Sequence, residues 1–536
     1  MSNDVHNHRP YSLPRLGEGQ GGGCVANVKN FAYLRRVFPN FVLSGTGIML
    51  TPYENDTICA IATPPGQGAI AIIRVSGPEA ISVCESVFSP KKKGLKITDA
   101  ETHTIHFGTI GKEEEMLDEV LVSVFRQPHS YTGENAVEIS CHGSSYIQQK
   151  IVELLISKGA RHARPGEFTL RAYQNGRFDL SQAEAVADLI AASSKASHDL
   201  ALQQMRGGFS KKISELRGKL LDFVSLIELE LDFSQEDVEF ADRSALIKLL
   251  RELQSELSDL ANSFSLGNVL RTGIPVAIIG KPNVGKSTLL NAILNEERAI
   301  VSPIPGTTRD TIEDTIVHNN YAFRFIDTAG LRHSNDEIES MGIGRTYEKI
   351  SQAAIVLYVF DASITTYEDV LAEMLQFKGQ RSKVKDEGTE GLGHRERTAD
   401  RRPLTADQKK FLLIANKTDM LEESPHGLKG FLEMECIFVS AKRKENINLI
   451  LDRLVESVKE LDIQDKAVVS NIRHYEALTK SLQSVEAVLA GLESGLSGDL
   501  LTVELRTALY HLGEITGEIS TEDILGNIFG RFCVGK

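Results

Sequence analysis

The stretch that decides the fold runs from Ile274 to Ser287 and reads Ile-Pro-Val-Ala-Ile-Ile-Gly-Lys-Pro-Asn-Val-Gly-Lys-Ser. Its first half is an apolar run of strand length, and residues 280–287 have the P-loop spacing G-x4-G-K-S. Residues 288–294 then read as a helix. Glycines let backbone N–H groups face a phosphate at a helix N-terminus, where the helix dipole favours anions. The stretch therefore predicts a phosphate-binding loop between a buried strand and a helix.

Downstream of this loop, short apolar runs alternate with helical segments as far as about residue 455. The runs lie at 321–327, 355–361, 411–416 and 435–440. This alternation is typical of a doubly wound parallel sheet. A charged stretch without periodicity, 376–410, interrupts the alternation, and we interpret it as an exposed, mobile insertion loop.

Three further motifs follow predicted strands, in the order and spacing of a GTP-binding domain. They are Asp327-Thr-Ala-Gly330, Asn416-Lys-Thr-Asp419 and Ser440-Ala-Lys442. The Asp419 carboxylate suits the N1–H and 2-amino donors of guanine, a pair that adenine lacks. Each motif alone is more often a plain loop, but four in this order are specific. We therefore predict a Ras-like P-loop G domain that binds GTP rather than ATP.

The residue types at these motifs suit a nucleotide with its magnesium ion. We expect Lys286 to reach the β- and γ-phosphates and the Ser287 hydroxyl to bind Mg²⁺. Thr308 lies between the P-loop and Asp327, where a switch I threonine would also bind Mg²⁺, although a single threonine there also suits a solvated loop. Asp327 can hold the metal through water, and the Gly330 amide can sense the γ-phosphate.

The catalytic charge needs an unusual source, because Leu331 stands where Ras-like proteins place a glutamine that orients water. Leucine cannot position water. Asn283 in the P-loop offers a side-chain oxygen near the phosphates, which can ligate a monovalent cation. A K⁺ ion held there would take the place of an arginine finger. The alternative is that Asn283 merely caps the loop.

The flanking segments differ from the G domain. Strand-like runs at 58–62, 69–75 and 120–125, mixed with helical segments, predict an α+β domain over about 52–170. Residues 181–268 and the segment from about 462 to the end share a helical composition rich in Leu, Glu, Lys and Ala. We therefore expect one helical domain into which the G domain is inserted.

Composition limits the class of protein. The 536 residues carry 59 Lys and Arg against 73 Asp and Glu, a net charge of −14, so nucleic acid would have to bind at local basic patches. No apolar run approaches the ~20 residues of a membrane span. Six widely spaced cysteines give no zinc or CxxC spacing, which indicates a reduced, cytoplasmic protein. Residues 1–51 look like an extension that is not native or is disordered, with translation starting at Met49 favoured over a transit peptide.

With these motifs in place, the chain resembles the MnmE (TrmE) family of tRNA-modifying GTPases from about residue 52 to the C-terminus. Beyond the G-domain motifs, the resemblance rests on residues 62–68, 131–134, 163–168, 179–190 and the tail Phe532-Cys-Val-Gly-Lys536. The tail is the most specific, because a generic GTPase has little structural reason to end in this way.

The resemblance implies a domain organisation and a reaction. It implies an N-terminal folate-binding and dimerisation domain (52–170), a helical domain (171–268 and 459–536) and a G domain (269–458). Family members form a heterotetramer with an FAD-binding partner, MnmG, and add a (carboxymethyl)aminomethyl group to C5 of the wobble uridine of certain tRNAs. A tetrahydrofolate, 5-formyl-tetrahydrofolate or a relative, supplies the one-carbon unit. Their G domains dimerise with K⁺, which stimulates hydrolysis. Whether glycine or ammonium is the second substrate stays open.

The resemblance also implies roles for individual residues. Glu339 matches the catalytic glutamate that orients the attacking water, acting with Lys286. Cys533 matches a near-terminal cysteine whose role is either chemical or structural. The implied K⁺ ligands are Asn283, Ser302, Ile304 and Thr307, and the implied folate contacts are Arg74, Glu138, Arg177 (lysine in some members) and Lys536. The GTP contacts expected overall are Asn283, Val284, Gly285, Lys286, Ser287, Thr288, Ser302, Thr307, Thr308, Asp327, Thr328, Ala329, Gly330, Asn416, Lys417, Asp419, Ser440, Ala441 and Lys442.

Two other interpretations are weaker. A ribosome-assembly GTPase of the Era or Der type also carries asparagine in its P-loop, but it lacks the folate-like N-terminal domain and the Cys-Val-Gly-Lys tail. A structural scaffold with a decayed nucleotide site would not retain all four motifs intact.

Overall fold

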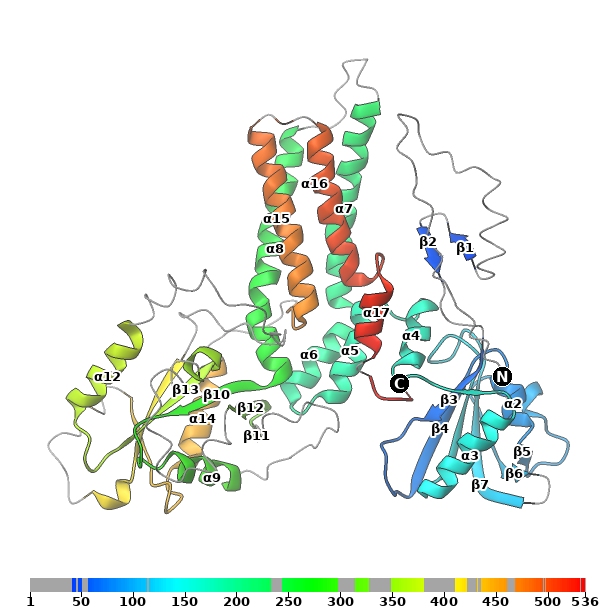
Figure 1. Cartoon of the computed structure of the whole chain (residues 1–536), viewed down its shortest axis with the longest axis horizontal. Coiled ribbons are helices and arrows are strands. Elements are labelled where there is room, and N and C mark those ends of the chain that lie inside the picture. Colours follow the sequence, from blue (N-terminus) through cyan, green and yellow to red (C-terminus); the bar gives the residue numbers. More distant parts are fainter. Residues whose placement is uncertain are drawn as a thin grey trace, which may run out of the picture.

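The computed structural model describes thirteen segments of the chain and the single residue 431. The segments are 41–44, 47–50, 56–112, 115–232, 243–296, 314–326, 349–379, 410–421, 435–459, 468–494, 496, 498–530 and 532–535. Their elements form two sheet-containing domains on either side of a bundle of long helices (Figure 1). None of the helices within these residues is long and apolar enough to cross a membrane.

The G domain is a six-stranded sheet in the order β11-β12-β10-β13-β14-β15. Its strands are β10 (Ile274–Ile279), β11 (Asp314–His318), β12 (Tyr321–Phe325), β13 (Ile355–Asp361), β14 (Lys410–Asn416) and β15 (Ile437–Phe438). All neighbours pair in parallel except β11, which pairs antiparallel with β12. The prediction of a doubly wound parallel sheet is therefore right for the central strands, but it missed this antiparallel edge strand.

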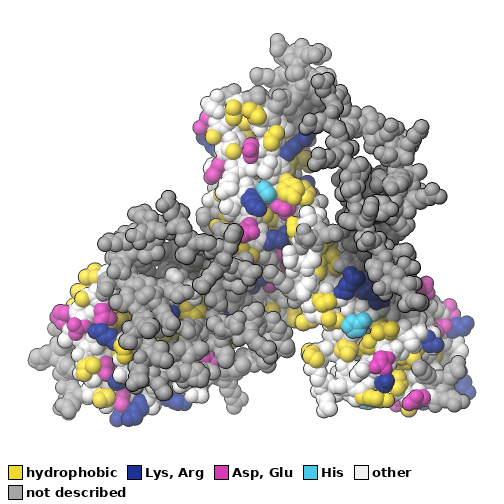
Figure 2. Space-filling view, in the orientation of Figure 1, with side chains coloured by type: hydrophobic (Ala, Val, Ile, Leu, Met, Phe, Trp, Pro, Cys, Tyr) yellow, Lys and Arg dark blue, Asp and Glu magenta, His cyan; other side chains and the backbone are white. Residues whose placement is uncertain are grey.

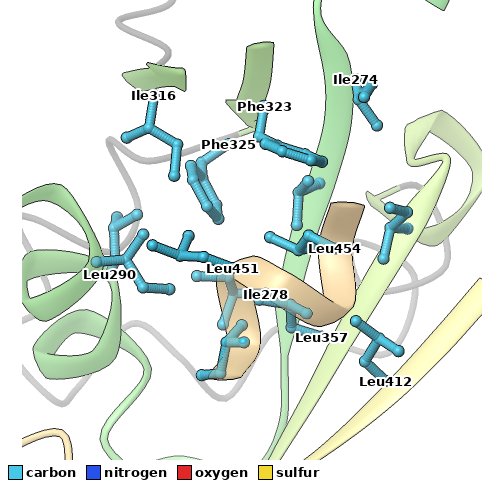
Figure 3. Close-up of a cluster of buried hydrophobic side chains, with 14 of the residues drawn as sticks. Ile274, Ile278, Leu290, Ile316, Phe323, Phe325, Leu357, Leu412, Leu451 and Leu454 are labelled. Carbon is cyan, nitrogen blue, oxygen red and sulfur yellow. The ribbon is translucent and has the colours of Figure 1, made fainter. Parts of the chain in front are cut away.

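Helices cover both faces of the G-domain sheet. On one face, α9 (Lys286–Glu296) and α14 (Ile447–Lys459) pack on Ile278, Leu357 and their neighbours, as Figure 3 shows. On the other face, α12 (Tyr367–Gly379) packs on side chains that include Ile279 and Tyr358. Because consecutive residues of a strand point to opposite faces, every residue of β10 and β13 is buried.

The N-terminal domain contains a seven-stranded sheet in the order β5-β6-β7-β8-β4-β3-β9. The strands are β3 (Ile58–Ile61), β4 (Ile70–Ser76), β5 (Phe88–Pro90), β6 (Thr104–Lys112), β7 (Glu115–Phe125), β8 (Ala136–His142) and β9 (Arg161–His162). All pairs are antiparallel except β3 with β9. The helices α2 (Ala80–Glu85) and α3 (Ser145–Ser157) pack on one face of this sheet.

The opposite face of this sheet carries exposed apolar side chains. Phe107 pairs with Leu121 across β6 and β7, and Ile105 lies two residues from Phe107 on the same face. Ile105 is 67% exposed, Phe107 46% and Leu121 46%. We call these three residues the open apolar face. The G-domain sheet has no such exposed face among its described strands, because helices cover both of its sides.

Four antiparallel helices form the bundle: α7 (Gly208–Asp232), α8 (Arg243–Thr272), α15 (Ile472–Glu493) and α16 (Gly498–Thr516). Shorter helices, α5 (Leu180–Ala191) and α6 (Lys195–Met205), lie at its base (Figure 1). The first two bundle helices precede the G domain in sequence and the last two follow it. This arrangement confirms the prediction that the G domain is inserted into a helical domain.

Contacts fix the G domain to the base of the bundle. Only Gly273 separates the end of α8 from the start of β10. Leu200 of α6 is buried in the G-domain core, and the Ala196 N–H donates to the Asn320 carbonyl in the β11–β12 turn at 3.0 Å. The predicted domain boundary at 268/269 falls inside α8, and the boundary at 170/171 falls inside α4 (Glu167–Gln174).

The C-terminus returns to the N-terminal domain. Helix α17 (Glu522–Phe529) packs against α4, where Phe529 and Phe532 join Leu170 and Leu180 in a small apolar core. The tail residues 532–535 follow directly. Residues 532–535 therefore lie beside β3 and β4 of the N-terminal domain.

Two regions differ from or extend the sequence prediction. Residues 376–379, which were assigned to the insertion loop, continue helix α12, and the rest of that loop (380–409) lies outside the described residues. In the predicted N-terminal extension, the structure describes a short antiparallel pair, β1 (Phe41–Ser44) with β2 (Gly47–Leu50).

Candidate functional site

The P-loop lies between β10 and α9 with its backbone in the shape that phosphate binding needs. Gly280 has φ +148°, Asn283 +63° and Gly285 +95°. A Cβ on Gly280 would meet the Val359 carbonyl oxygen at 2.1 Å, so this position has no room for a side chain. Asn283 is exposed and adopts the left-handed conformation, which asparagine tolerates better than most residues.

The first turn of α9 carries the predicted phosphate and metal ligands. The Lys286 ammonium donates to the carbonyl oxygens of Gly280 (3.0 Å) and Lys281 (2.8 Å), so it lies over the loop it would serve. Ser287 and Thr288 follow in the same turn, and Val284 is buried beneath it. The structure thus brings the P-loop residues together as a turn followed by a helix N-terminus, an arrangement that suits an anion.

Asn416 connects the P-loop to the two predicted guanine-binding loops. Its side-chain amide donates to the Val284 carbonyl at 2.8 Å, and its side-chain oxygen accepts from the Ala441 N–H at 3.0 Å. Asn416 is 2% exposed. These bonds explain why an asparagine suits this position, because its amide nitrogen donates to one loop while its amide oxygen accepts from the other.

The Asp419 carboxylate is positioned by the neighbouring loop. The Ser440 hydroxyl, which is fully buried, donates to Asp419 Oδ1 at 2.7 Å. This hydrogen bond lowers the pKa of the Asp419 carboxyl below its ordinary value. An ionised carboxylate at this place can accept from two donors of a base, and guanine presents two. Lys442 lies in the same loop as Ser440 and Ala441.

Lys417 has a partner that sequence reasoning missed. Its ammonium forms an ion pair with Asp361 at 2.7 Å, and its backbone adopts the left-handed conformation (φ +65°). Burial opposes ionisation of Asp361, but Lys417 and Ser363 outweigh it and keep the pKa of this carboxyl below its ordinary value. The available signal was an acid at the carboxyl end of the buried strand β13, where functional residues of parallel sheets gather.

A second missed residue, Glu373 of α12, contacts the P-loop. Glu373 accepts from the ammonium of Lys281 at 2.6 Å and from the hydroxyl of Tyr358. Lys281 directly follows Gly280, so this carboxylate links α12, β13 and the P-loop. The sequence carried no signal for it, because Glu373 is one of several acids on an amphipathic helix.

Several predicted residues lie outside the described residues, so the structure places neither their side chains nor their loops. They are Ser302, Ile304, Thr307, Thr308, Asp327, Thr328, Ala329, Gly330, Glu339 and Lys536. Of the expected metal ligands, the structure therefore describes only Asn283 and Ser287. No cluster of three or more metal-binding side chains (His, Cys, Asp, Glu) occurs among the described residues.

The N-terminal domain brings two of the predicted folate contacts together. Arg74 of β4 and Glu138 of β8 pair across the sheet, and the Arg74 guanidinium donates twice to Glu138 Oε1, at 3.0 and 2.8 Å. The same guanidinium donates to the Gly535 carbonyl of the C-terminal tail at 3.4 Å. The residue before Lys536 therefore reaches this pair.

Aromatic rings surround this pair. The Arg74 guanidinium lies 5.0 Å from the centre of the Tyr131 ring and 5.7 Å from that of Phe168. The Tyr131 ring also makes an edge contact with Phe178, beside Arg177. Arg177 is exposed, and its aliphatic part borders Gly133 in the loop that carries Tyr131. This group of side chains, with two arginines, one glutamate and several aromatic rings, suits a flat, charged ligand.

Cys533 is an exposed free thiol in the tail. Its carbonyl accepts from the Gly166 N–H at 3.5 Å, a contact that fixes the tail backbone but leaves the sulfur free to face solvent. The other free cysteines among the described residues are buried or half-buried.

The fold and this site define a P-loop GTPase with an N-terminal domain and a helical domain added to its G domain. Family models match nearly all of the chain after residue 56. The model of the GTP-binding protein TrmE N-terminus covers residues 57–177, and that of the MnmE helical domain covers residues 180–533.

The chain belongs to the MnmE family of tRNA modification GTPases. The tRNA modification GTPase MnmE of Christiangramia forsetii is 52% identical over 492 residues, which cover 90% of this chain and 99% of that protein. The protein of the same name from Bacteroides fragilis is 50% identical over 491 residues, covering 90% of this chain and all of that protein. Membership favours tRNA modification over the ribosome-assembly alternative.

Among solved structures, the FeoB G domain of Methanococcus jannaschii is similar to 35% of this chain and 98% of its own length, at 23% identity. The TM-score of this match is 0.21.

Proposed function

We propose that this chain is a K⁺-stimulated GTPase that acts in modification of the tRNA wobble uridine. With an FAD-binding partner of the MnmG type, in a heterotetramer, it would use a tetrahydrofolate one-carbon unit to add a (carboxymethyl)aminomethyl group at C5. The observation that carries this proposal is the convergence of the C-terminal tail, Arg74 and Glu138 in a chain that also joins Ser440 to Asp419, the residues proposed to bind guanine.

In this proposal the G domain binds GTP with Mg²⁺. Lys286 neutralises the β- and γ-phosphates, Ser287 and Thr308 ligate Mg²⁺, and Asp419 with Ser440 selects guanine. The hydrogen bonds from Ser440 to Asp419 and from Asn416 to Val284 support the assignment, because they connect the P-loop and the two proposed guanine-binding loops.

Hydrolysis would depend on a monovalent cation. Asn283, Ser302, Ile304 and Thr307 are the proposed K⁺ ligands, and Glu339 is the proposed residue that orients water. The exposed position of Asn283 in the P-loop supports this role, since its side chain is free to face a cation between two G domains. A bound K⁺ ion would supply the positive charge that an arginine finger supplies elsewhere.

The folate would bind around Arg74, Glu138, Arg177 and Lys536. Cations suit the carboxylates of the folate glutamate, and a carboxylate suits the N–H donors of a pterin. Among the described residues only Oε1 of Glu138 accepts from Arg74, so Oε2 can accept from a ligand. The rings of Tyr131 and Phe168 give a flat ligand surfaces to pack on.

A homodimer through the N-terminal domain follows from the open apolar face. Ile105, Phe107 and Leu121 leave apolar surface in water on β6 and β7, whereas Phe168 of α4 covers the part of this face beside Arg74. An isologous contact between two copies would bury this face. The proposed folate residues Arg74 and Glu138 lie on the same side of the sheet, so a second copy would also close over them.

Nucleoside analysis of tRNA from a deletion strain tests this function. We expect the modified wobble uridine to disappear on deletion and to return with a plasmid carrying the wild-type gene. Complementation with Arg74→Ala should fail although that variant still hydrolyses GTP, because the folate residue lies in a different domain from the nucleotide site. Unchanged tRNA nucleosides in the deletion strain would contradict the proposal.

A further inference from the structure

One exposed edge of the N-terminal domain has a charge opposite to that of the chain as a whole. The loop between β5 and the short helix η1 (Ile97–Asp99) contains Lys91, Lys92, Lys93 and Lys96, here called the lysine edge. All four residues are exposed. Residues 91–101 contain these four lysines against Asp99 and Glu101, a net charge of +2 in a chain of −14. An acidic protein that handles RNA needs such a local patch.

Hydrogen bonds fix the backbone of the lysine edge, so its four lysine side chains extend from defined positions. The Lys91 N–H donates to the Phe107 carbonyl of β6 at 2.9 Å, and the Leu95 N–H donates to the Lys92 carbonyl at 3.3 Å. Gly94, at the corner of this turn, has φ +76°, which suits glycine. Ile97 is 1% exposed and anchors the end of the loop in the core.

The lysine side chains themselves have no internal role. No hydrogen bond or ion pair joins any of their ammonium groups to another of the residues that the structure describes. By contrast, the neighbouring Arg126 donates from Nε to the Ala100 carbonyl at 2.8 Å and also to the Thr98 carbonyl. Arg126 therefore holds η1 in place, while the four lysines face solvent. In the view of Figure 2, the N-terminal domain presents both basic and acidic side chains as well as apolar ones.

Two exposed imidazoles continue the surface beyond Arg126. His103 precedes β6 and His129 follows Arg126, and their ring centres are 6.5 Å apart. His103 also makes an edge contact with Phe125. RNA-binding surfaces combine cations with rings on which unpaired bases stack, whereas an acidic protein partner needs only the cations. The combination favours RNA.

We propose that the lysine edge binds the phosphate backbone of the tRNA whose wobble uridine is modified. This inference rests on the proposed function and adds a binding surface to it. Lysine contacts phosphate as a point charge without reading bases, so the surface would position the tRNA and leave the choice of tRNA to other contacts.

The sheet geometry suits this arrangement. β5 is an edge strand, and β6, β7 and β8 separate it from β4, which carries Arg74. Four strand spacings of about 4.8 Å place the lysine edge about 19 Å from the proposed folate site across the sheet. This distance is close to the width of a nucleic-acid helix. A tRNA stem bound at the lysine edge would therefore extend across the sheet and bring a base of its loop near the proposed folate site.

The test compares two variants of the full-length chain in binding an unmodified tRNA transcript with uridine at the wobble position. The first replaces all four lysines of the edge with glutamine (Lys91→Gln, Lys92→Gln, Lys93→Gln, Lys96→Gln). The matched control removes the same charge from exposed lysines elsewhere (Lys158→Gln, Lys211→Gln, Lys219→Gln, Lys480→Gln). Affinity is measured over a series of KCl concentrations, with the GTPase rate of each variant as a check on folding.

We expect the edge variant to bind tRNA about tenfold more weakly or worse near physiological salt. The slope of log K against log salt should become less negative by about 3 in this variant. Each lost phosphate contact removes roughly 0.7–0.9 from the size of the slope. The control variant should keep most of the affinity, and the GTPase rate should not change in either. The loss should be similar for different tRNAs.

Three results would overturn the inference: wild-type affinity in the edge variant, equal losses in both variants, or loss of binding to the FAD-binding partner with tRNA affinity intact. The last result would assign the edge to a protein interface. Deletion-strain nucleoside analysis tests the proposed function separately. A lost modification there, combined with wild-type tRNA affinity in the edge variant, would reject the surface and leave the function standing.

Discussion

The two sheets of this molecule bury their strands in different ways. In the G domain, β10 and β13 are buried at every position because helices cover both faces of the sheet. In the N-terminal domain, strands such as β7 alternate, with Val120, Val122 and Val124 buried and Leu121 exposed. The G-domain sheet is thus complete within one chain, and its function lies in the loops at the strand ends. The N-terminal sheet leaves apolar side chains of one face exposed, and there we propose that a second copy binds.

The largest effect is expected from a charge inside the doubly covered sheet. Val359→Asp places a carboxylate at a fully buried position of β13, which should cost about 4 kcal/mol or more and abolish GTP binding. Thermal unfolding and nucleotide titration measure both effects. Ile105→Asp on the open apolar face is the matched control and should change the stability of the isolated subunit by less than about 1 kcal/mol. Similar losses in the two variants would mean that the faces do not differ as described.

The open apolar face can be tested by its effect on assembly. Combining Ile105→Asp with Phe107→Asp should weaken dimerisation about a thousandfold, because each new charge occurs twice in a two-fold interface. Light scattering without nucleotide measures this. Leu500→Asp with Val503→Asp, at exposed apolar positions of α16, provides the control and should remain dimeric. A dimeric N-terminal variant would move the interface elsewhere.

A buried cluster of charged side chains in the helical domain makes the stability of the fold depend on pH in the acid range. Burial raises the pKa of Glu184, but His474 and Arg473 outweigh burial and lower it to about 2. His474 Nε2 lies 2.7 Å from Glu184 Oε2, and Arg473 lies 2.9 Å from the same oxygen. A lowered carboxyl pKa stabilises the fold above the unfolded value of about 4.5, and this contribution is lost as the pH falls from about 4.5 to about 2.

Urea unfolding at pH 6 and at pH 3 measures part of this contribution, and stability should fall by about 2 kcal/mol because pH 3 still lies above the folded pKa of about 2. Glu184→Gln should lower stability at pH 6 and flatten its fall on acidification. Glu476→Gln removes an exposed carboxyl of α15 and should leave the pH profile unchanged. A Glu184→Gln profile as steep as that of wild type would contradict the assignment.

The smallest effect is expected at the contact between α12 and the P-loop. Glu373→Gln weakens the ion pair with Lys281, a side chain that is 60% exposed, so the pair is worth about 0.2–1 kcal/mol. We expect the KM for GTP to rise about two- to fivefold with little change in kcat. Steady-state hydrolysis measures both, and Glu368→Gln on the same helix is the control. An unchanged KM would mean that this contact does not position the P-loop.

The sequence predicted the G-domain sheet better than the N-terminal sheet for a physical reason. Strands buried on both faces are continuous apolar runs, so the predicted strand at 355–361 matches β13 residue for residue. The strand β6 was missed because its pattern is inverted: the apolar Ile105 and Phe107 lie on the exposed face, whereas His106 and Gly108 lie on the face that carries the core. Short elements such as β5, β9 and α17 are defined by long-range packing, which leaves little local pattern.

The candidate site follows the same rule. The residues Asn416, Asp419 and Ser440 were readable because each motif is a short local pattern, although the hydrogen bonds that join the two motifs span 21 and 25 positions. The contact of the tail with Arg74 joins residues 461 positions apart, and its place came from family resemblance. Glu373 was missed because a lone acid on an amphipathic helix has no distinctive pattern in sequence, and Asp361 was missed although it ends a buried strand of a parallel sheet.

The central claim is that a monovalent cation held by Asn283 activates hydrolysis. The most direct measurement is GTP turnover in KCl against NaCl for wild type, Asn283→Ala and Asn283→Gly. The glycine variant removes the side chain without strain at φ +63°, whereas alanine adds about 1 kcal/mol of strain. We predict that wild type is faster in KCl and that both variants hydrolyse GTP at one slow rate in either salt. Full KCl stimulation in Asn283→Gly would contradict the account.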